Sequence, residues 1–393
     1  MRQLTIGGLC LLVAACGTEP RESRGTATLM DTLAPLSTTE IGVLDGVPAY
    51  LFGDIVGVTR DSEGVIYVAD RIGESVRAYD GDGVYLGTVG SEGDGPGEFR
   101  RLLHVIVDAD DQLVVRGAFR LSAFERSSGS QFADSVVRTV RAEGGRTDRD
   151  VPGRVSDSVY YSPGYEWEGF MRRGYYYEVY DRVEGTIVDT LAVPPLADPE
   201  STGRANYMVT EQGGMNVDGI NRAPFEARPS WDITSEGRVW FAEGERYEVF
   251  EVGPTGDTLR VVRRDVPEHR VPDAERRDSL AAFSQRLDSL PVPLDRVRGM
   301  SAMARERTTS PIFPAITNVR IGASGLLWVR RWSPSAQTTY DVFDSSGLVR
   351  VVTLPVRFES KPAPWLSLEV VAGVAVDAET GVERVVVLHL GGP

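Results

Sequence analysis

The stretch DSEGVIYVADRIGESVRAYDGDGVYLGTV, residues 61–89, decides the fold. It holds three short runs of β-branched and aromatic residues, at 64–68, 76–80 and 84–89, separated by glycine and aspartate. Runs of this kind, bounded by turn residues, are typical of β-strands because their side chains pack well on a pleated surface. Three of them in close succession predict an antiparallel meander.

The middle run of this unit recurs along the chain. Each copy places an aromatic residue before an acid, and a glycine follows within five residues, as a hairpin turn with a positive φ requires. The shortest spacing, from Tyr79 to Phe124, is 45 residues and suits one four-stranded blade of a β-propeller, while longer spacings hold insertions. The copies lie at 76–80, 121–125, 177–181, 247–251 and 340–344.

The two ends of the repeat region each lack a partner. Residues 369–390 supply two or three strands without an outer strand, and Glu40–Leu44 precedes the first blade without a hairpin partner. We expect these segments to form one sixth blade, which would close the ring and hide its edges. The predicted fold class is therefore all-β, a six-bladed β-propeller over residues 37–393.

Residues 61–70, 76–83 and 90–99 resemble the NHL-type repeats of six-bladed β-propellers. The resemblance covers the first blade closely, and later blades keep only its strand pattern; Asp108–Asp111 lacks the turn glycine. It implies that GSEGDGPGEF, residues 90–99, links the outer strand of one blade to the inner strand of the next. Glycines permit tight turns there, and we expect Phe99 to pack between blades.

The same linker could instead be a ligand site. Its glycines lack the spacing of a phosphate-binding loop, and its three acids would repel phosphate. Those acids, Glu92, Asp94 and Glu98, could supply oxygen ligands to calcium, although their spacing fits no EF-hand. We expect a structural turn and no cofactor, with calcium or another divalent ion as the open alternative.

The N-terminus predicts export. Residues 1–15 have a short basic start and an apolar run, as a signal peptide does. The following Val13-Ala14-Ala15-Cys16 resembles the lipobox of bacterial lipoproteins, which implies lipidation of Cys16 and a tether over residues 16–36. Gly17 after the cysteine implies the outer membrane, with the protein facing the periplasm or the cell surface. The alternative is an ordinary secretory signal with a chance cysteine.

The charge limits the partners. The formal net charge is −15, and so acidic a body is repelled by nucleic acid. We expect the membrane as a partner through the lipid anchor, together with an unknown protein or small ligand, and no nucleic acid.

Two insertions stand out from the repeat. At about 267–312, between blades four and five, Leu280, Phe283 and Leu287 predict an amphipathic helix with Asp273 as its cap and Pro291 as its stop, and residues 295–305 predict a second short helix. The helix either covers one propeller face or docks a partner protein.

The other insertion is rich in aromatic residues and arginine, which are enriched at binding hot spots. Its residues are the candidate binding set, and the alternative is a long hairpin that packs its rings on the neighbouring blade. The set consists of Tyr165, Trp167, Phe170, Arg172 and Arg173.

Catalytic patterns are sparse. The three histidines, His104, His269 and His389, fall in separate parts of the repeat, so we expect neither a shared metal site nor a catalytic set. The sequence thus favours a membrane-anchored, extracytoplasmic binding or scaffold module. The alternative is a metal-dependent hydrolase or lyase with its site at the central channel, like propeller enzymes of the gluconolactonase group.

Overall fold

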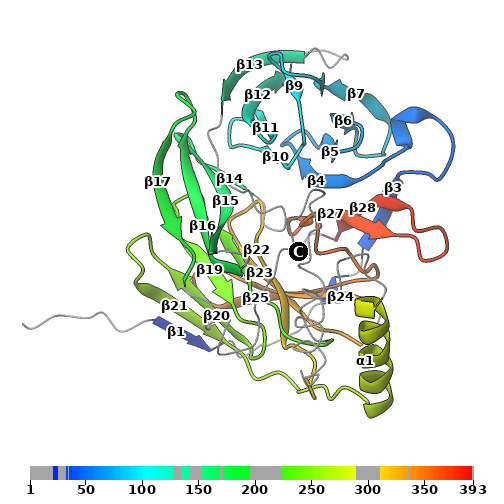
Figure 1. The fold of residues 1–393 in the computed structure, drawn as a ribbon, viewed down its shortest axis with the longest axis vertical. Coiled ribbons are helices and arrows are strands. Elements are labelled where there is room, and N and C mark those ends of the chain that lie inside the picture. The colour runs from blue at the N-terminus through cyan, green and yellow to red at the C-terminus, as the bar shows by residue number, and fades with distance from the viewer. Residues whose placement is uncertain are drawn as a thin grey trace, which may run out of the picture.

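Six sheets, each of four antiparallel strands, surround a central axis in the computed structural model (Figure 1). The structure describes residues 21–24, 32–33, 35–126, 134–141, 153–168, 171–194, 224–288, 310–334 and 337–391. The fold is the six-bladed β-propeller that the repeat predicts. Within blades one to five the four antiparallel strands follow in chain order from the axis outward, so the first strand is the inner strand.

Blades are numbered here from the sheet that contains residues 61–89. Blade one consists of β4 (Ile55–Arg60), β5 (Ile66–Asp70), β6 (Ser75–Tyr79) and β7 (Tyr85–Val89). Blade two consists of β10 (His104–Val107), β11 (Leu113–Arg116), β12 (Arg120–Arg126) and β13 (Asp134–Arg141). Blade three consists of β14 (Arg154–Val155), β15 (Val159–Glu168), β16 (Met171–Asp181) and β17 (Ile187–Ala192).

The remaining blades follow the same order. Blade four consists of β18 (Ser230–Ile233), β19 (Val239–Ala242), β20 (Glu248–Val252) and β21 (Thr258–Arg263). Blade five consists of β22 (Ile316–Ile321), β23 (Leu327–Arg331), β24 (Thr338–Phe343) and β25 (Leu348–Leu354). Blade six consists of β26 (Trp365–Leu366), β27 (Val370–Val376), β28 (Glu383–Leu390) and β3 (Pro35–Ile41).

Blade six closes the ring as expected. Its outer strand β3 comes from the N-terminal side and pairs antiparallel with β28, from Ile41 opposite Val385 to Pro35 opposite Leu390. The strand lies a few residues before the expected Glu40–Leu44, and a 3₁₀ turn at Pro48–Tyr50 follows it. Ile41 is fully buried in a cluster with Val58 and Val385, so closure joins the cores of blades six and one.

The stretch expected as a tether contributes further strands. β1 (Arg21–Arg24) pairs parallel with β21, and β2 (Thr32–Leu33) pairs parallel with β25. The sheets of blades four and five thereby gain a fifth strand, which pairs with the outer edge of each sheet. The expectation of an unpaired tether is corrected at these positions, whereas residues 1–20, including Cys16, lie outside the described residues.

The linker 90–99 is a compact turn. β8 (Ser91–Glu92) and β9 (Glu98–Phe99) pair parallel, and the N–H of Gly93 donates to the carbonyl of Phe99 at 3.0 Å. Phe99 is buried and meets Phe124 edge-on at 5.7 Å between ring centroids, within a core shared by blades one and two. The Glu98 carboxylate accepts the Gly95 N–H at 2.6 Å, so it serves the turn. These contacts support the interpretation of residues 90–99 as a structural turn that links blade one to blade two.

One helix, α1 (Asp273–Asp288), lies at the periphery of the ring (Figure 1). It connects blades four and five. If the blades are instead counted from β3, which belongs to the closing blade and comes first in the chain, these are the fifth and sixth blades. Asp273 is the first helical residue, and the carbonyl of Pro272 accepts the N–H of Arg276, so Pro272 and not Asp273 occupies the cap position.

The described residues cover 267–288 and 310–312 of the predicted helical insertion. Leu280 and Phe283 are half-buried, while most of their neighbours on α1 are exposed. Residues 289–309, which include the expected stop and the second helix, lie outside the described part of the chain. In that described part, no helix combines the length and apolar character needed to cross a membrane.

Candidate functional site

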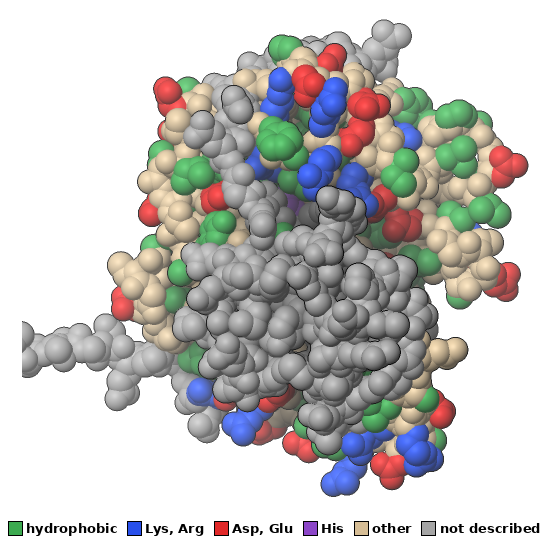
Figure 2. Space-filling model, viewed as in Figure 1, with side chains coloured by type: hydrophobic (Ala, Val, Ile, Leu, Met, Phe, Trp, Pro, Cys, Tyr) green, Lys and Arg blue, Asp and Glu red, His purple; other side chains and the backbone are tan. Residues whose placement is uncertain are grey.

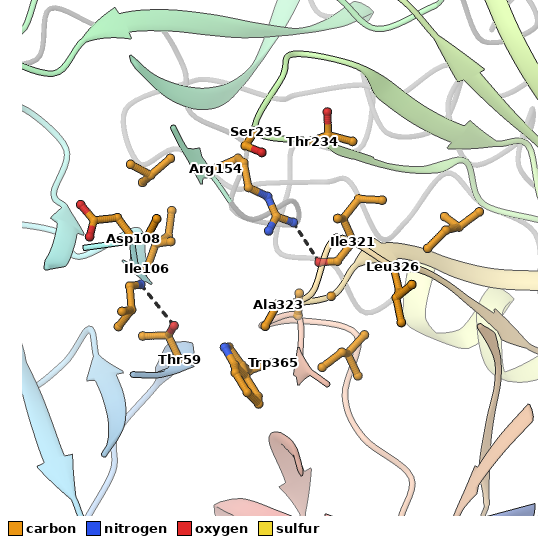
Figure 3. A pocket seen from close by; sticks show the side chains of 18 of the residues that line it. Thr59, Ile106, Asp108, Arg154, Thr234, Ser235, Ile321, Ala323, Leu326 and Trp365 are labelled. Carbon is orange, nitrogen blue, oxygen red and sulfur yellow. Dashed lines mark hydrogen bonds between the residues drawn. The ribbon is translucent and has the colours of Figure 1, made fainter. Parts of the chain in front are cut away.

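A cavity of about 740 Å³ lies on the propeller axis, and residues from all six blades line it. Figure 3 shows side chains from well-separated strands converging on it. The lining comes mainly from the inner strands and from the turns that join them to the second strands. Because each blade contributes a short rigid segment, the wall is assembled from parts that are distant in sequence.

A repeated turn builds the rim. The side chain of the first turn residue accepts the N–H at the start of the second strand: Val65 donates to Asp61 at 2.8 Å, and Gln112 donates to Asp108 at 2.8 Å. In blade four the N–H of Arg238 donates to Thr234 at 3.2 Å. Ser156 and Ser367 play this role in blades three and six. Short polar side chains are suited to such local bonds.

Blade two shows how the repeat survives without its turn glycine. Gly64, Gly237 and Gly325 have positive φ values of 94°, 78° and 75° in three of these turns. Asp111 occupies the same place in blade two with a φ of 58°. Aspartate tolerates the left-handed region better than most residues, so the missing glycine leaves the turn intact.

The inner strands carry a free backbone edge toward the axis, and side chains of the preceding blade satisfy part of it. Thr59 accepts the N–H of Val107 at 3.3 Å. In the same way the hydroxyl of Ser230 accepts the N–H of Val319 at 2.9 Å, and Asp232 accepts the N–H of Ile321 at 2.8 Å. Buried backbone donors are thereby paired, and neighbouring blades are held in register.

Arg154 projects into the cavity from the inner strand of blade three (Figure 3). Its Nε donates to the carbonyl of Ile233 at 3.0 Å, and its Nη2 donates to the carbonyl of Ile321 at 2.9 Å. Nη2 also pairs at 3.1 Å with the carboxylate of Asp232, which is fully buried. These bonds fix the guanidinium and join three blades.

The carboxylates that line the cavity are engaged within the protein. Asp61 accepts a hydrogen bond from the hydroxyl of Tyr67 at 3.0 Å. The pKa of Tyr67 is raised far above its usual value, mainly by burial and next by the negative charge of Asp61. Asp108 forms an ion pair with Arg182. The other acids are held likewise: Glu251 pairs with Arg238 at 2.8 Å, Glu236 accepts from Ser235, Asp344 accepts from Ser346, and Asp111 accepts from Ser62.

Hydroxyl donors hold two of these acids in the charged form. Hydrogen bonds from Thr234 and Ser235 lower the pKa of Glu236, and the hydrogen bond from Ser346 lowers the pKa of Asp344. Both carboxylates therefore remain ionised and committed to their turns at neutral pH.

The candidate binding set on the aromatic hairpin lies elsewhere. β15 and β16 form the long hairpin, with Tyr165 opposite Tyr175 and Trp167 opposite Arg172. Its turn is at the opposite end of blade three from Ser156 and the cavity. Tyr165 is half-buried, and the side chains of the remaining members of the set (Trp167, Phe170, Arg172 and Arg173) lie outside the described residues.

The described rings of this hairpin pack inside the protein. Tyr175 meets Trp231 of blade four at 4.1 Å between ring centroids, and Tyr161 and Tyr177 belong to the same buried cluster. This is the packing alternative that the sequence left open. Tyr165, the member of the set whose side chain is described, does not line the central cavity.

The histidines remain apart. His104 is buried at the start of β10, His269 lies against Trp332 at 4.9 Å, and His389 lies on β28. Within the described ranges, no three histidine, cysteine, aspartate or glutamate side chains are grouped as metal ligands.

The face seen in Figure 2 carries basic side chains in the upper part of the view, with acidic side chains beside them, and further basic side chains at its lower edge. Two arginines are bound to the linker 90–99: Arg100 pairs with Asp94 at 3.0 Å, and Arg120 donates to the carbonyl of Gly95 at 2.6 Å. These arginines therefore stabilise the join between blades one and two.

Sequence reasoning missed the cavity-lining residues. Thr59, Ile106, Arg154 and Trp365 belong to different repeats and form no local motif. The signal that could have found them is their shared position two residues before the turn residue of each blade.

Comparisons with known proteins agree with the architecture. A family described as 6-bladed beta-propeller matches residues 49–119, which cover blade one and the first half of blade two. No sequence match is found among curated proteins.

Solved structures match over most of the chain at low identity. A member of the duf4221 family from Bacteroides vulgatus is 10% identical, with 92% of this chain and 98% of that one covered and a TM-score of 0.49. Virginiamycin B lyase from Staphylococcus aureus is 10% identical, with 90% and 99% covered and a TM-score of 0.39. The calcium-binding protein regucalcin from Agrobacterium tumefaciens is 11% identical, with 93% and 98% covered and a TM-score of 0.40.

Proposed function

We propose that the protein is a membrane-anchored, extracytoplasmic β-propeller that binds a small ligand in its central cavity. The observation that carries this proposal is the cavity itself, about 740 Å³ in volume and lined by all six blades. Ligand pockets in proteins usually measure about 300–1,000 Å³ and combine apolar walls with a few oriented polar groups.

The cavity has both kinds of wall. Trp365, Ile106 and Leu326 supply apolar surface, and Arg154 supplies an oriented guanidinium (Figure 3). Because the lining lies on strands and tight turns, its geometry is largely set before a ligand arrives. Binding to such a site costs little ordering entropy, which favours a small molecule.

The anchor is part of the proposal. The signal-like N-terminus and the lipobox resemblance around Cys16 support an outer-membrane lipoprotein of the NHL-repeat type, held in the cell envelope. Acyl chains contribute about 0.8 kcal/mol per buried CH₂, so two or more chains would hold the protein on the membrane. Replacing Cys16 with serine should move the protein from the membrane fraction to the soluble fraction. Retention of the Cys16→Ser protein on membranes would refute the anchor.

The donor set does not favour the metal-dependent hydrolase or lyase. The acids at the cavity wall are each committed to a turn or an ion pair, so a metal would have to compete with existing bonds. A scaffold role through α1 has less support than the cavity does, since the exposed side chains among the described helix residues are alanine or polar, while Leu280 and Phe283 are half-buried.

Two neighbouring residues allow a matched test. Ala323 lines the cavity, whereas Ser324, the next residue in the same exposed turn, does not. We expect Ala323→Trp to obstruct the cavity and Ser324→Trp to leave it open. After incubation with a small-molecule extract of native cells and gel filtration, mass spectrometry should find a molecule retained by the wild type and by Ser324→Trp only. Equal retention by Ala323→Trp would refute the cavity as the site.

A further inference from the structure

Arg60 differs from every other charged side chain that lines the cavity. It ends the inner strand β4, is half-buried, and stacks its guanidinium over the indole of Trp365 at 5.7 Å from the ring centroid. Across the described ranges, its guanidinium makes no hydrogen bond or ion pair. Each of the other arginines at the wall is bound to a carboxylate or a carbonyl: Arg154, Arg238 and Arg260.

A guanidinium that lines a cavity without a hydrogen bond or ion pair of its own favours the binding of an anion there. Half-burial removes part of the water around the guanidinium, which costs hydration free energy. A charge-assisted hydrogen bond to a carboxylate compensates for this cost. The planar fork of arginine fits a carboxylate with two parallel bonds, and its position over Trp365 keeps the fork oriented.

The surrounding charge limits the ligand to a single negative charge. The wall carries six carboxylates, and the chain as a whole has a net charge of −15. One free guanidinium can neutralise one carboxylate, whereas a phosphate dianion or a polyanion would meet uncompensated repulsion.

The apolar part of the wall indicates the rest of the ligand. Trp365 forms the base on which Arg60 stacks, and Ile106 and Leu326 are half-buried at the wall with their side chains labelled in Figure 3. A flat apolar body can pack against these groups while its carboxylate reaches Arg60.

We propose that the central cavity binds an organic monocarboxylate, with the carboxylate paired to Arg60 and an apolar body packed against Trp365. This inference rests on the proposed function, since it names the ligand class of the same cavity. Arg60 is then a ligand-binding residue, whereas Arg154 holds three blades together and is already saturated.

Indole-3-acetate and its uncharged amide, indole-3-acetamide, are suitable probes because they differ in charge and hardly in shape. Calorimetric titration of the full-length protein should show the acid binding at least tenfold more tightly than the amide. Arg60→Gln should remove at least tenfold of the affinity for the acid and leave the amide unchanged. Arg60→Lys, which keeps the charge, should retain part of the preference.

Arg277→Gln, on the exposed side of α1, is the matched control and should bind like the wild type. Folding of the variants is checked by their thermal midpoints, which should agree because Arg60 makes no hydrogen bond within the described structure. Equal binding of acid and amide, or undiminished binding of the acid to Arg60→Gln, would overturn the ligand class but not the cavity. No binding of either probe at millimolar concentration would also overturn the class, and the Ala323→Trp comparison would still decide on the cavity.

Discussion

Two arginines in one cavity illustrate how surroundings decide the role of a side chain. Arg154 donates to two carbonyls and a buried carboxylate, so its guanidinium is part of the frame. Within the described residues, the Arg60 guanidinium lies over the face of Trp365 and makes no hydrogen bond or ion pair, so it remains available to solvent or a ligand. The residue type alone could not separate these roles, because the carbonyls that saturate Arg154 come from blades four and five.

A buried tyrosine makes the free energy of unfolding depend on pH in the alkaline range, because its hydroxyl ionises less readily in the folded protein than in the unfolded chain. Burial is the largest influence on Tyr160 and raises its pKa to about 12, although the positive charge of Arg116 opposes the shift. The folded pKa exceeds the unfolded value of about 10. The stabilising contribution is therefore fully present below pH 10 and is lost as the pH rises through 12.

Tyr160→Phe tests this sign. Between pH 10 and 12 the free energy of unfolding of the wild type should fall by about 2–3 kcal/mol more than that of the variant, because the slope is about 1.4 kcal/mol per pH unit for one proton. At pH 7 the two proteins should agree far more closely than at pH 11.5, because the Tyr160 hydroxyl is protonated at pH 7 in both the folded and the unfolded state. Urea unfolding at pH 7 and pH 11.5 measures both quantities. The same alkaline loss in both proteins would contradict the assignment.

At the scale of elements, the linker 90–99 depends on glycine at a specific place. Gly90 has a φ of 70°, and a Cβ there would lie 2.1 Å from Cε2 of Phe99. Gly81, in the hairpin of blade one, has no atom within 4 Å of such a Cβ. The two glycines look alike in the sequence, but only one of them is pressed against a buried ring.

Gly90→Ala should therefore lower the free energy of unfolding by about 3 kcal/mol, since it combines a strained φ with overpacking against Phe99. Gly81→Ala should change it by less than about 0.5 kcal/mol. Chemical unfolding of the two variants in parallel gives the comparison. Similar values for both would mean that the linker is looser than the contacts of Phe99 indicate.

Strand β3 carries the ring closure, and its two ends differ in burial. Ile41 is fully buried between blades six and one, while Leu36 is 77% exposed. Ile41→Ala should cost about 3 kcal/mol, in the range found for large-to-small changes in protein cores. Leu36→Ala should cost less than about 0.5 kcal/mol. If thermal and urea unfolding show equal effects, β3 does not close the propeller.

At the scale of the whole molecule, the sequence and the structure agree where the signal is local. Runs such as residues 64–68 and 84–89 predict strands because alternation and turn glycines act over a few residues. The edge strands β1 and β2 were not predicted, because the runs RESR and TL are short and carry no alternation of apolar and polar residues. The residues that line the cavity were not predicted either, since Arg60 and Trp365 lie in blades one and six and meet only after the ring closes.

Composition points to a different part of the chain from the cavity. The hairpin around Tyr165 stands out because aromatic residues and arginines are concentrated there, yet its described rings serve the packing of blades three and four. The cavity residues are single members of six separate turns. Aligning the blades and comparing the residues that lie two positions before each turn would have grouped Thr59, Ile106, Arg154 and Trp365.

Hydrogen–deuterium exchange tests the central claim most directly, because it reports on every candidate surface at once. The wild-type protein is measured with and without the small-molecule extract of native cells. We predict that the extract slows exchange in the inner turns, at residues 58–65 and 321–327, and leaves exchange at the hairpin 165–173 and at α1 unchanged. Protection confined to the hairpin or to α1, with the inner turns unchanged, would contradict it.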